Sequence, residues 1–326
     1  MRAPLLLISA VLLAGAASPA LAFDCAKART PLEKAICADT AAAQADDSMS
    51  AVYAVLQGET GKADAPVLLR NQRAWLQRRE SVCRDWSKPD PTFDRACLAR
   101  ETQARGRLLA GLAEHEGPGA LRFRPSFSER IDPKWKIEVS IAVPQLADGA
   151  AAAPGLDELL QATAKAADQP VDNDPRYTYD AGYAITYDSG ELVSVVFDIY
   201  VDHGGAHGQG VQAAANYSPA LGRALKVDDL VDGKGIAALT SRCRALLRQE
   251  KLKRGATPDM VDGDLTEQAV ADGIRSIEAW QFRGDSVAIH YDAYAIGAYA
   301  EGPYDCALPW AEIRRAAKPG APLPKG

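Results

Sequence analysis

The chain has 326 residues, of which 47% are hydrophobic and 25% are charged, a composition typical of a globular protein that is long enough for two domains. The formal net charge of -6 argues against nucleic acid as a partner, because proteins that bind nucleic acid are usually basic. A mildly acidic surface would suit a cationic partner, but most acidic proteins are merely soluble.

The first 22 residues have the features of a signal peptide. Arg2 gives a positive start, an apolar run extends from Leu5 to Leu13, and a small-residue A-x-A cleavage site ends at Ala22. The run is too short for a membrane anchor, and no later stretch approaches the roughly 20 apolar residues of a spanning helix. We therefore expect cleavage near Ala22 and a periplasmic or secreted mature chain with no membrane span.

All six cysteines lie in the expected mature chain. An even number of cysteines in an oxidising compartment predicts disulfides. Cys25 and Cys37 are not spaced as a CxxC redox motif or as a zinc-binding pair. We therefore expect disulfides, with no metal and no cofactor.

The region that follows the signal peptide predicts three helices. Thr30 is the expected N-cap of the first helix, with Pro31 at the first helical position and Glu33 completing a capping box. Loops at 58–66 and around the "DWSKPDP" stretch separate this helix from a second over about 67–82 and from a third that ends near Leu112. In the second helix Trp75 is expected in the core. The arginines of this helix are expected on its solvated face. These are Arg70, Arg73, Arg78 and Arg79.

The positions of the first four cysteines favour one pairing. Cys37 and Cys83 are equally far from the centre of the loop between the first two helices, so an antiparallel hairpin would bring them side by side. This favours a Cys37–Cys83 bridge with a nested Cys25–Cys97 bridge outside it. Four cysteines allow three pairings, so the other two stay open.

The C-terminal part mixes strands and helices without a regular βαβ rhythm, which indicates an α+β domain. Strands are expected at 135–144, on both sides of a Gly/His turn within 191–218, and within 286–310, with helices at 155–168 and 235–253. Cys243 and Cys306 are left to pair with each other. The predicted fold is thus an N-terminal all-α, three-helix, disulfide-stapled domain plus a C-terminal α+β domain. Its expected parts are a signal peptide (1–22), the helical domain (23–115), a linker (116–130), the α+β domain (131–318) and a tail (319–326).

Three blocks of the helical region carry a family pattern. The block F-D-C-x2-A-x-T-P-x-E-x-A-I-C covers Phe23 to Cys37, the block N-x2-A-W-L-x2-R-x3-C covers Asn71 to Cys83, and Cys97-Leu98 closes the pattern. The pattern resembles the LprI-type domain, a family named for a lysozyme inhibitor, over roughly Phe23 to Leu112. The resemblance implies the fold of that family and a lysozyme-binding role.

The C-terminal part carries a second resemblance. "GGAHG" from Gly204 to Gly208, followed by L-K-V-D-D-L, and the later "YAIGAYAEGPYDCALPW" are similar to the extracellular domain of RsiV, an anti-sigma factor that senses lysozyme. The similarity spans about Ile131 to Ile313. Because the chain shows no sigma-binding segment and no transmembrane helix, signalling by the route of RsiV is not expected.

The "HGGAHG" stretch also raises the question of catalysis or metal binding. His203 and His207 are candidates for a metal site or a general base, with His290 and Asp292 as further ligands. No third ligand stands at a recognisable spacing, and no hydrolase elbow, zinc-protease, P-loop or dinucleotide motif occurs. The favoured interpretation is a tight turn or a partner contact, and we predict no catalytic residues and no enzyme activity.

Both resemblances point to the same partner, so the sequence predicts an exported lysozyme-binding protein that inhibits lysozyme. Lysozyme cleaves a glycosidic bond with two carboxylates in a cleft, which a rigid loop can block. The candidate contact residues lie on two loops, where tyrosines offer contact area at low entropy cost. These residues are Asp202, His203, Gly204, Gly205, His207, Tyr294, Tyr299, Glu301 and Tyr304. The alternatives are a non-catalytic peptidoglycan-binding module of the cell envelope and, third, a metal-dependent hydrolase.

Overall fold

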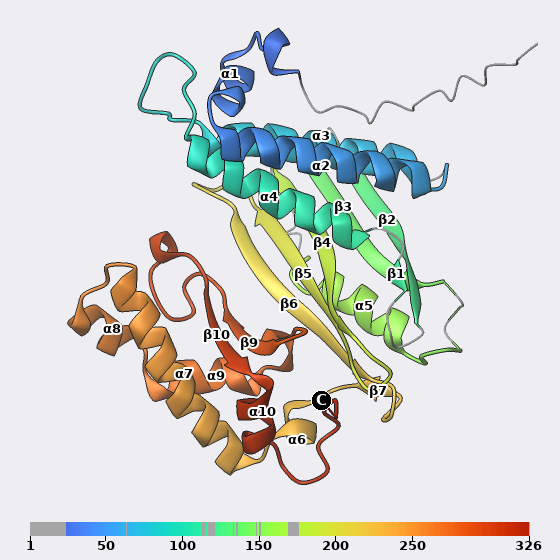
Figure 1. Ribbon diagram of the computed structural model, residues 1–326, viewed down its shortest axis with the longest axis vertical. Helices are drawn as coiled ribbons and strands as arrows, with labels where there is room; N and C mark the ends of the chain where they lie inside the picture. The colour runs from blue at the N-terminus through green and yellow to red at the C-terminus, as the bar shows by residue number, and fades with distance from the viewer. Residues whose placement is uncertain are drawn as a thin grey trace, which may run out of the picture.

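The computed structural model describes residues 24–62, 64–112, 115–116, 121–132, 134, 136–147, 149, 151–168 and 176–325. The signal peptide expected at 1–22 lies outside the described residues. A seven-stranded sheet runs through the middle of the molecule, with the N-terminal helices packed on it and a second, smaller unit of helices and strands beside it (Figure 1). The helices with their disulfides, followed by mixed sheet and helix, confirm the predicted fold class.

The large sheet has its strands in chain order. They are β1 (His115–Glu116), β2 (Arg122–Asp132), β3 (Ile137–Leu146), β4 (Tyr177–Asp188), β5 (Val193–Asp202), β6 (Gln209–Ser218) and β7 (Arg223–Ala224). Only the β3–β4 pair is parallel among these described strands, and α5 (Leu156–Ala164) lies in its connection, as a crossover requires. Residues 122–130, expected within a linker, instead form most of β2.

Four helices make up the region that we call the helical unit. They are α1 (Pro31–Cys37), α2 (Thr40–Glu59), α3 (Ala65–Cys83) and α4 (Arg95–Leu112), preceded by the 3-10 turn η1 (Cys25–Lys27). The predicted capping box is confirmed, because the Thr30 hydroxyl accepts from the Glu33 backbone N–H and the Glu33 carboxylate accepts from the Thr30 N–H. The first expected helix is divided in two. The chain turns after Cys37, and Asp39 starts α2 by accepting from the Ala42 N–H at 2.9 Å.

The division of this helix explains why the favoured cysteine pairing is wrong. The bridges are Cys25–Cys37, which links η1 to the end of α1, and Cys83–Cys97, which links the end of α3 to the start of α4. A Cys37–Cys83 bridge requires one continuous helix from Thr30 to the loop at 58–66. With a turn before α2, Cys37 no longer continues the line of the helix that faces α3, and both bridges close local loops.

The large sheet carries helices on both faces, as the alternation of side chains along β4 shows. On one face, Asp180 accepts a hydrogen bond from the Asn71 side chain of α3, and Gly182 gives room to Leu108 of α4. A Cβ at Gly182 would lie only 2.6 Å from a Leu108 methyl carbon. On the other face, the Tyr179 hydroxyl donates to a carbonyl oxygen of α5 at 2.7 Å. The helical unit therefore shares one hydrophobic core with the sheet.

The environment of α3 agrees only in part with expectation. Trp75 is buried as predicted, with 7% of its surface exposed. The arginines were expected on a solvated face, and this is wrong for Arg79, which is 5% exposed and pairs with Asp46 at 3.0 Å. Arg78 is also drawn inward, to Asp180 of β4 at 3.4 Å. The cause is that α3 packs between the other helices and the sheet, where carboxylates face it.

A second unit, which we call the C-terminal unit, follows β7. It contains α6 (Val227–Leu230), α7 (Gly233–Lys253), α8 (Pro258–Asp264), α9 (Glu267–Arg275), η2 (Ile277–Ala279), β8 (Trp280–Phe282), β9 (Ser286–Tyr291), η3 (Tyr299–Glu301), β10 (Tyr304–Pro309) and α10 (Trp310–Ala316). Its strands form an antiparallel sheet in the order β10-β9-β8 around a separate hydrophobic core. No helix among the described residues is both long enough and apolar enough to span a membrane.

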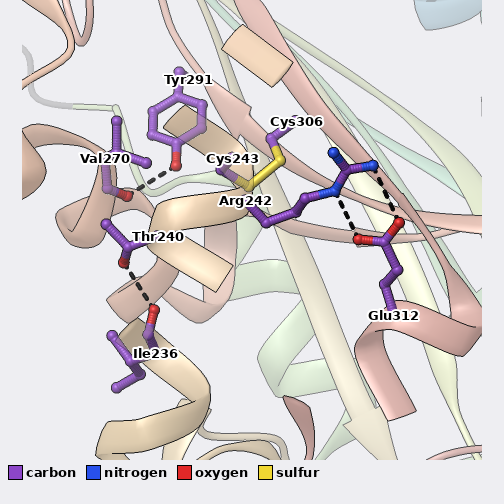
Figure 2. Close-up of a disulfide and its surroundings, with 8 residues drawn as sticks. All are labelled: Ile236, Thr240, Arg242, Cys243, Val270, Tyr291, Cys306 and Glu312. Atoms are coloured by element: carbon purple, nitrogen blue, oxygen red, sulfur yellow. Dashed lines mark hydrogen bonds and ion pairs between the residues drawn. A yellow bond between two sulfur atoms is a disulfide. The ribbon is translucent and has the colours of Figure 1, made fainter. Parts of the chain in front are cut away.

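The third disulfide fastens the C-terminal unit internally. Cys243 of α7 bonds to Cys306 of β10, as predicted, and both residues are fully buried (Figure 2). Nearby, Arg242 of α7 forms a bidentate ion pair with Glu312 of α10. The long helix, the edge strand and the last helix are thus held together at one place.

Candidate functional site

The two sequence-predicted loops meet on the surface of the molecule. The first loop is the β5–β6 connection, residues 203–208, which follows the buried Asp202. The second loop is the β9–β10 connection, residues 292–303, which carries Tyr294 and Tyr299. The Asp202 carboxylate accepts from the Gly204 N–H at 2.7 Å and from Arg176 at 3.0 Å. Gly204 has φ of 77°, a left-handed conformation that favours glycine. Asp202 and Gly204 therefore shape the turn.

The contact between the loops is aromatic. The His207 ring stacks on the Tyr299 ring with centroids 4.1 Å apart and an angle of 22° between the planes. The Tyr299 hydroxyl donates to the Gly208 carbonyl at 3.0 Å, and the Tyr294 ring lies 5.3 Å from that of Tyr299. Tyr294 is 60% exposed and has the unusual positive φ of 75°. We call His207, Tyr294 and Tyr299 the aromatic cluster.

The two histidines of the turn point to different neighbours. His203 lies with its ring 5.1 Å from that of Tyr177, while His207 lies against Tyr299. His290, suggested as a further ligand, instead contacts two aspartates of its own unit. Among the described residues, no group of three or more His, Cys, Asp or Glu side chains is placed to hold a metal ion. Gly205 is exposed, with open space where a Cβ would stand.

Two other predicted contact residues face inward. Glu301 accepts from Lys251 at 2.6 Å and from the Tyr304 hydroxyl at 2.7 Å. Tyr304 is only 2% exposed, and the Arg254 guanidinium lies 4.2 Å from its ring centroid. The Lys251 hydrogen bond lowers the pKa of Glu301 to about 2, against an opposing effect of burial. Glu301 and Tyr304 thus anchor the end of the β9–β10 loop in the interior. Tyr294 and Tyr299 of the aromatic cluster remain as the part of this loop that a partner can contact.

The helical unit reaches the same end of the sheet. The Arg78 guanidinium of α3 lies 4.8 Å from the ring centroid of Tyr200, near the end of β5. The Tyr200 hydroxyl in turn fills the space beside Gly208, where a Cβ would come within 2.2 Å of it. Beyond Arg78, α3 ends at Cys83 and is followed by Trp86, which is 68% exposed. Sequence reasoning missed Trp86, although an isolated tryptophan in a Pro/Asp-rich loop was a usable signal.

The structure also contains a cleft that the sequence did not predict. It has a volume of about 1130 Å³, and its lining residues come from α4, from the C-terminal unit and from strands β4, β5 and β6 of the large sheet. Figure 1 shows where these elements lie. Arg107 stands on the α4 wall, Lys253 on the α7 wall, and Asp198 and Gln212 on the floor formed by β5 and β6. The cleft thus combines residues from three regions of the chain.

A chain of hydrogen bonds fixes the polar side chains at the cleft. Gln212 donates to Asp198 and accepts from Gln281 at 2.7 Å. Arg283 donates to Gln281 at 2.6 Å and to Asp305 at 2.9 Å. The surrounding cleft shields the Asp198 carboxyl from part of the solvent although the residue remains exposed, and this desolvation raises its pKa. The hydrogen bond from Gln212 and the charges of His290 and Arg107 offset only part of this effect. The floor therefore presents groups of fixed orientation.

His290 closes this network. One ring nitrogen lies 2.7 Å from Asp305 and the other 3.1 Å from Asp292, which also accepts from the Gln212 backbone N–H. Burial lowers the pKa of His290, but the hydrogen bonds to the two aspartates outweigh it and raise the pKa to about 9. The imidazole is thus positively charged at neutral pH and ties β9 to β6 and β10.

Comparison with known proteins gives a family match for the N-terminal segment and a partial similarity to solved structures. No curated protein matches the chain. Two crystal structures of DUF3298 family proteins are similar to it in part. The protein from Pseudomonas aeruginosa PAO1 has 19% identity, covers 63% of this chain and 96% of its own, and gives a TM-score of 0.47. The protein from Bacteroides fragilis NCTC 9343 has 18% identity, covers 62% and 95%, and gives a TM-score of 0.41. Residues 25–109, which include both N-terminal disulfides, match the family described as Lysozyme inhibitor LprI.

Proposed function

We propose that the protein is an exported, periplasmic lysozyme-binding protein that inhibits lysozyme by blocking its glycosidase cleft. The observation that carries the proposal is the match of residues 25–109 to the LprI lysozyme-inhibitor family. Three disulfides support a location outside the cytoplasm, because such bonds persist in oxidising compartments. The proposal requires no catalytic residue in this chain.

We place the lysozyme contact at the end of the molecule where the aromatic cluster lies. Tyrosine offers a large contact area with few rotatable bonds, and the stacking of His207 on Tyr299 holds the two loops in one shape before binding. The matched helical segment borders this end through the contact of Arg78 with Tyr200. Trp86 extends the helical side of the surface.

Charge supports the same partner. The chain carries a formal net charge of -6, which suits a lysozyme whose own net charge is positive. Opposite net charges speed the encounter, while buried aromatic anchors supply most of the affinity. A rigid loop seated across the two catalytic carboxylates is sufficient to exclude the glycan substrate.

The test is calorimetric titration of the mature chain, 23–326, with a c-type lysozyme, beside a lytic assay. Tyr299→Ala should weaken binding about thirtyfold, as expected for an aromatic anchor of about 2 kcal/mol. Leu221→Ala is the matched control, because Leu221 is 42% exposed and lies beyond the far end of β6. Absence of binding to several lysozyme types would remove the inhibitor proposal. A larger effect of Trp86→Ala than of Tyr299→Ala would move the contact to the helical unit.

A second candidate is a non-catalytic module that binds peptidoglycan. The observation that favours it is the exposed Tyr294 ring beside Tyr299, since sugar rings stack on exposed aromatic faces. Retention on purified cell-wall material without lysozyme, and its loss in Tyr294→Ala, would favour this function.

A further inference from the structure

We propose that the cleft between α4 and α7 is a binding site for a small sugar that carries a carboxylate. The site is separate from the proposed lysozyme contact, since no residue of the aromatic cluster lines it. The inference goes beyond the proposed function and does not depend on it. Three features of the cleft carry it: its size and rigidity, the arrangement of its charges, and the kind of side chains on its floor.

The cleft is large and its floor is rigid. Its volume of about 1130 Å³ is slightly larger than that of most ligand sites, which is roughly 300 to 1,000 Å³. The floor strands β4, β5 and β6 are each paired on both sides. The hydrogen bonds that run from Asp198 through Gln212 and Gln281 fix the floor side chains before any ligand arrives. Such a floor costs little ordering entropy on binding.

The charges select a carboxylate. Within the described part of the chain, Arg107 forms no ion pair, and Lys253 has only a loose contact of 3.7 Å with Glu250. These two cations face the cleft from opposite walls of a protein whose net charge is negative. Both side chains are exposed to solvent and neither is held in a close ion pair, so they are free to pair with a ligand, and a carboxylate can form bidentate hydrogen bonds with an arginine.

The floor selects hydroxyl groups beside that carboxylate. Asp198 accepts from Gln212 and is otherwise open to the cleft, so it repels a bare anion and accepts from a hydroxyl or amide donor. Gln249 of α7 adds an exposed amide that can both donate to and accept from a polyol, whereas the amide of the buried Gln281 is already bonded to Gln212 and Arg283. The ligand must therefore carry hydroxyl groups and a carboxylate together.

An acidic peptide fits these features less well. Peptide side chains are usually held in apolar pockets, as in the known groove and strand-addition modes. The apolar lining here mixes small side chains, Ala104, Ala184 and Ala307, with larger ones such as Leu108 and Leu246, and polar side chains stand among them. A sugar ring needs only a limited apolar surface with polar groups around its edge, and the cleft offers both.

The experiment uses calorimetry on the mature chain without lysozyme. The probes are N-acetylmuramic acid, its neutral analogue N-acetylglucosamine, which lacks the lactyl carboxylate, and glucuronic acid as a carboxylated sugar of another source. We expect saturable binding of at least one acidic sugar and at least tenfold weaker binding of N-acetylglucosamine. Preference for N-acetylmuramic acid would indicate that the ligand is a cell-wall sugar. Equal binding of glucuronic acid would indicate that the site accepts uronic acids in general. Both results support the site.

The variants locate the binding. Arg107→Gln should weaken binding of the acidic sugar about tenfold, as for a lost charge-assisted hydrogen bond. Arg95→Gln removes the same charge from the exposed first residue of α4, outside the cleft, and should leave binding unchanged. Circular dichroism checks folding, and Lys253→Gln on the opposite wall replaces Arg107→Gln if that variant does not fold.

Three results would overturn the inference. They are no saturable binding of either acidic sugar at millimolar concentration, equal binding of N-acetylglucosamine, and tighter binding of a glutamate-rich peptide. The outcome is distinct from that of the lysozyme test, because Tyr299→Ala should leave sugar binding intact and Arg107→Gln should leave lysozyme binding intact.

Discussion

Replacing Glu301 by glutamine should loosen the loop that carries Tyr299. The Glu301 carboxylate holds three groups: the Lys251 ammonium at 2.6 Å, the Tyr304 hydroxyl at 2.7 Å and the Ala298 backbone N–H at 2.9 Å. Lys251 is fully buried, so its charge depends on this partner and on Asp264 at 2.9 Å. A neutral amide keeps the size of the side chain and removes the charge.

The pKa of Glu301 gives the size of the effect. The hydrogen bond from Lys251 is the main cause that lowers this pKa from 4.5 to about 2, and the side chain is only 18% exposed. At 1.36 kcal/mol per unit, the ionised carboxylate stabilises the fold by about 3 kcal/mol at neutral pH. Because the pKa of the folded state lies below that of the unfolded state, this contribution is complete well above pH 4.5 and is lost as the pH falls toward 2.

The assay is urea unfolding of the wild type and Glu301→Gln at pH 7 and near pH 2. We expect a loss of about 3 kcal/mol at pH 7 that nearly disappears at the lower pH. The matched control is Glu312→Gln, whose partner Arg242 is 47% exposed and whose loss should cost at most about 1 kcal/mol. An equal loss at both pH values, or equal losses in the two variants, would refute the role of the buried ion pair.

Three further predictions test the loop, the disulfide and the network. Gly208→Ala should destabilise the protein by about 1 to 3 kcal/mol in thermal melts and weaken lysozyme binding in calorimetry, because its Cβ would come within 2.2 Å of the Tyr200 hydroxyl. Gly205→Ala is the control, and it should change neither stability nor binding because no atom lies within 4 Å of its Cβ. Replacing Cys243 and Cys306 together by alanine opens a loop of 63 residues and should cost about 4 kcal/mol in urea under non-reducing conditions, more than removal of either shorter N-terminal bridge. His290 has its pKa raised from 6.5 to about 9, so its charge stabilises the fold below pH 6.5 and this contribution is lost as the pH rises through 9; His290→Gln should remove that alkaline dependence, and an unchanged pH profile of unfolding would contradict it.

Local signals predicted much of the fold. The Thr30–Glu33 capping box, the hairpin within 191–218 and the long helix around Cys243 all appear where the residue pattern places them. The predicted pairing of Cys37 with Cys83 is wrong, and a local signal explains why. The Asp39 side chain starts a new helix, and a hairpin argument that ignores this N-cap gives the wrong position for Cys37.

The candidate surface was predicted only in part. The contact of His207 with Tyr299 joins residues far apart in the sequence, and no spacing rule shows it. The inward direction of Tyr304 was available from the sequence, because it alternates with Cys306 along a strand, and Cys306 was expected in a disulfide. Residues two positions apart on a strand point to the same face of the sheet, so a buried Cys306 implies a buried Tyr304.

The arrangement of the units decides how the inhibitor proposal can be tested. Met49, Leu68 and Trp75 of the segment that matches LprI belong to the hydrophobic core of the large sheet. Removing that segment would expose their apolar surfaces, at a cost of about 2 kcal/mol for each large side chain. If an isolated 25–109 fragment did not bind lysozyme, the cause could therefore be a loss of folding and not the loss of a contact. Point variants of the whole mature chain keep this core intact, and only they separate the helical side of the surface from the aromatic cluster.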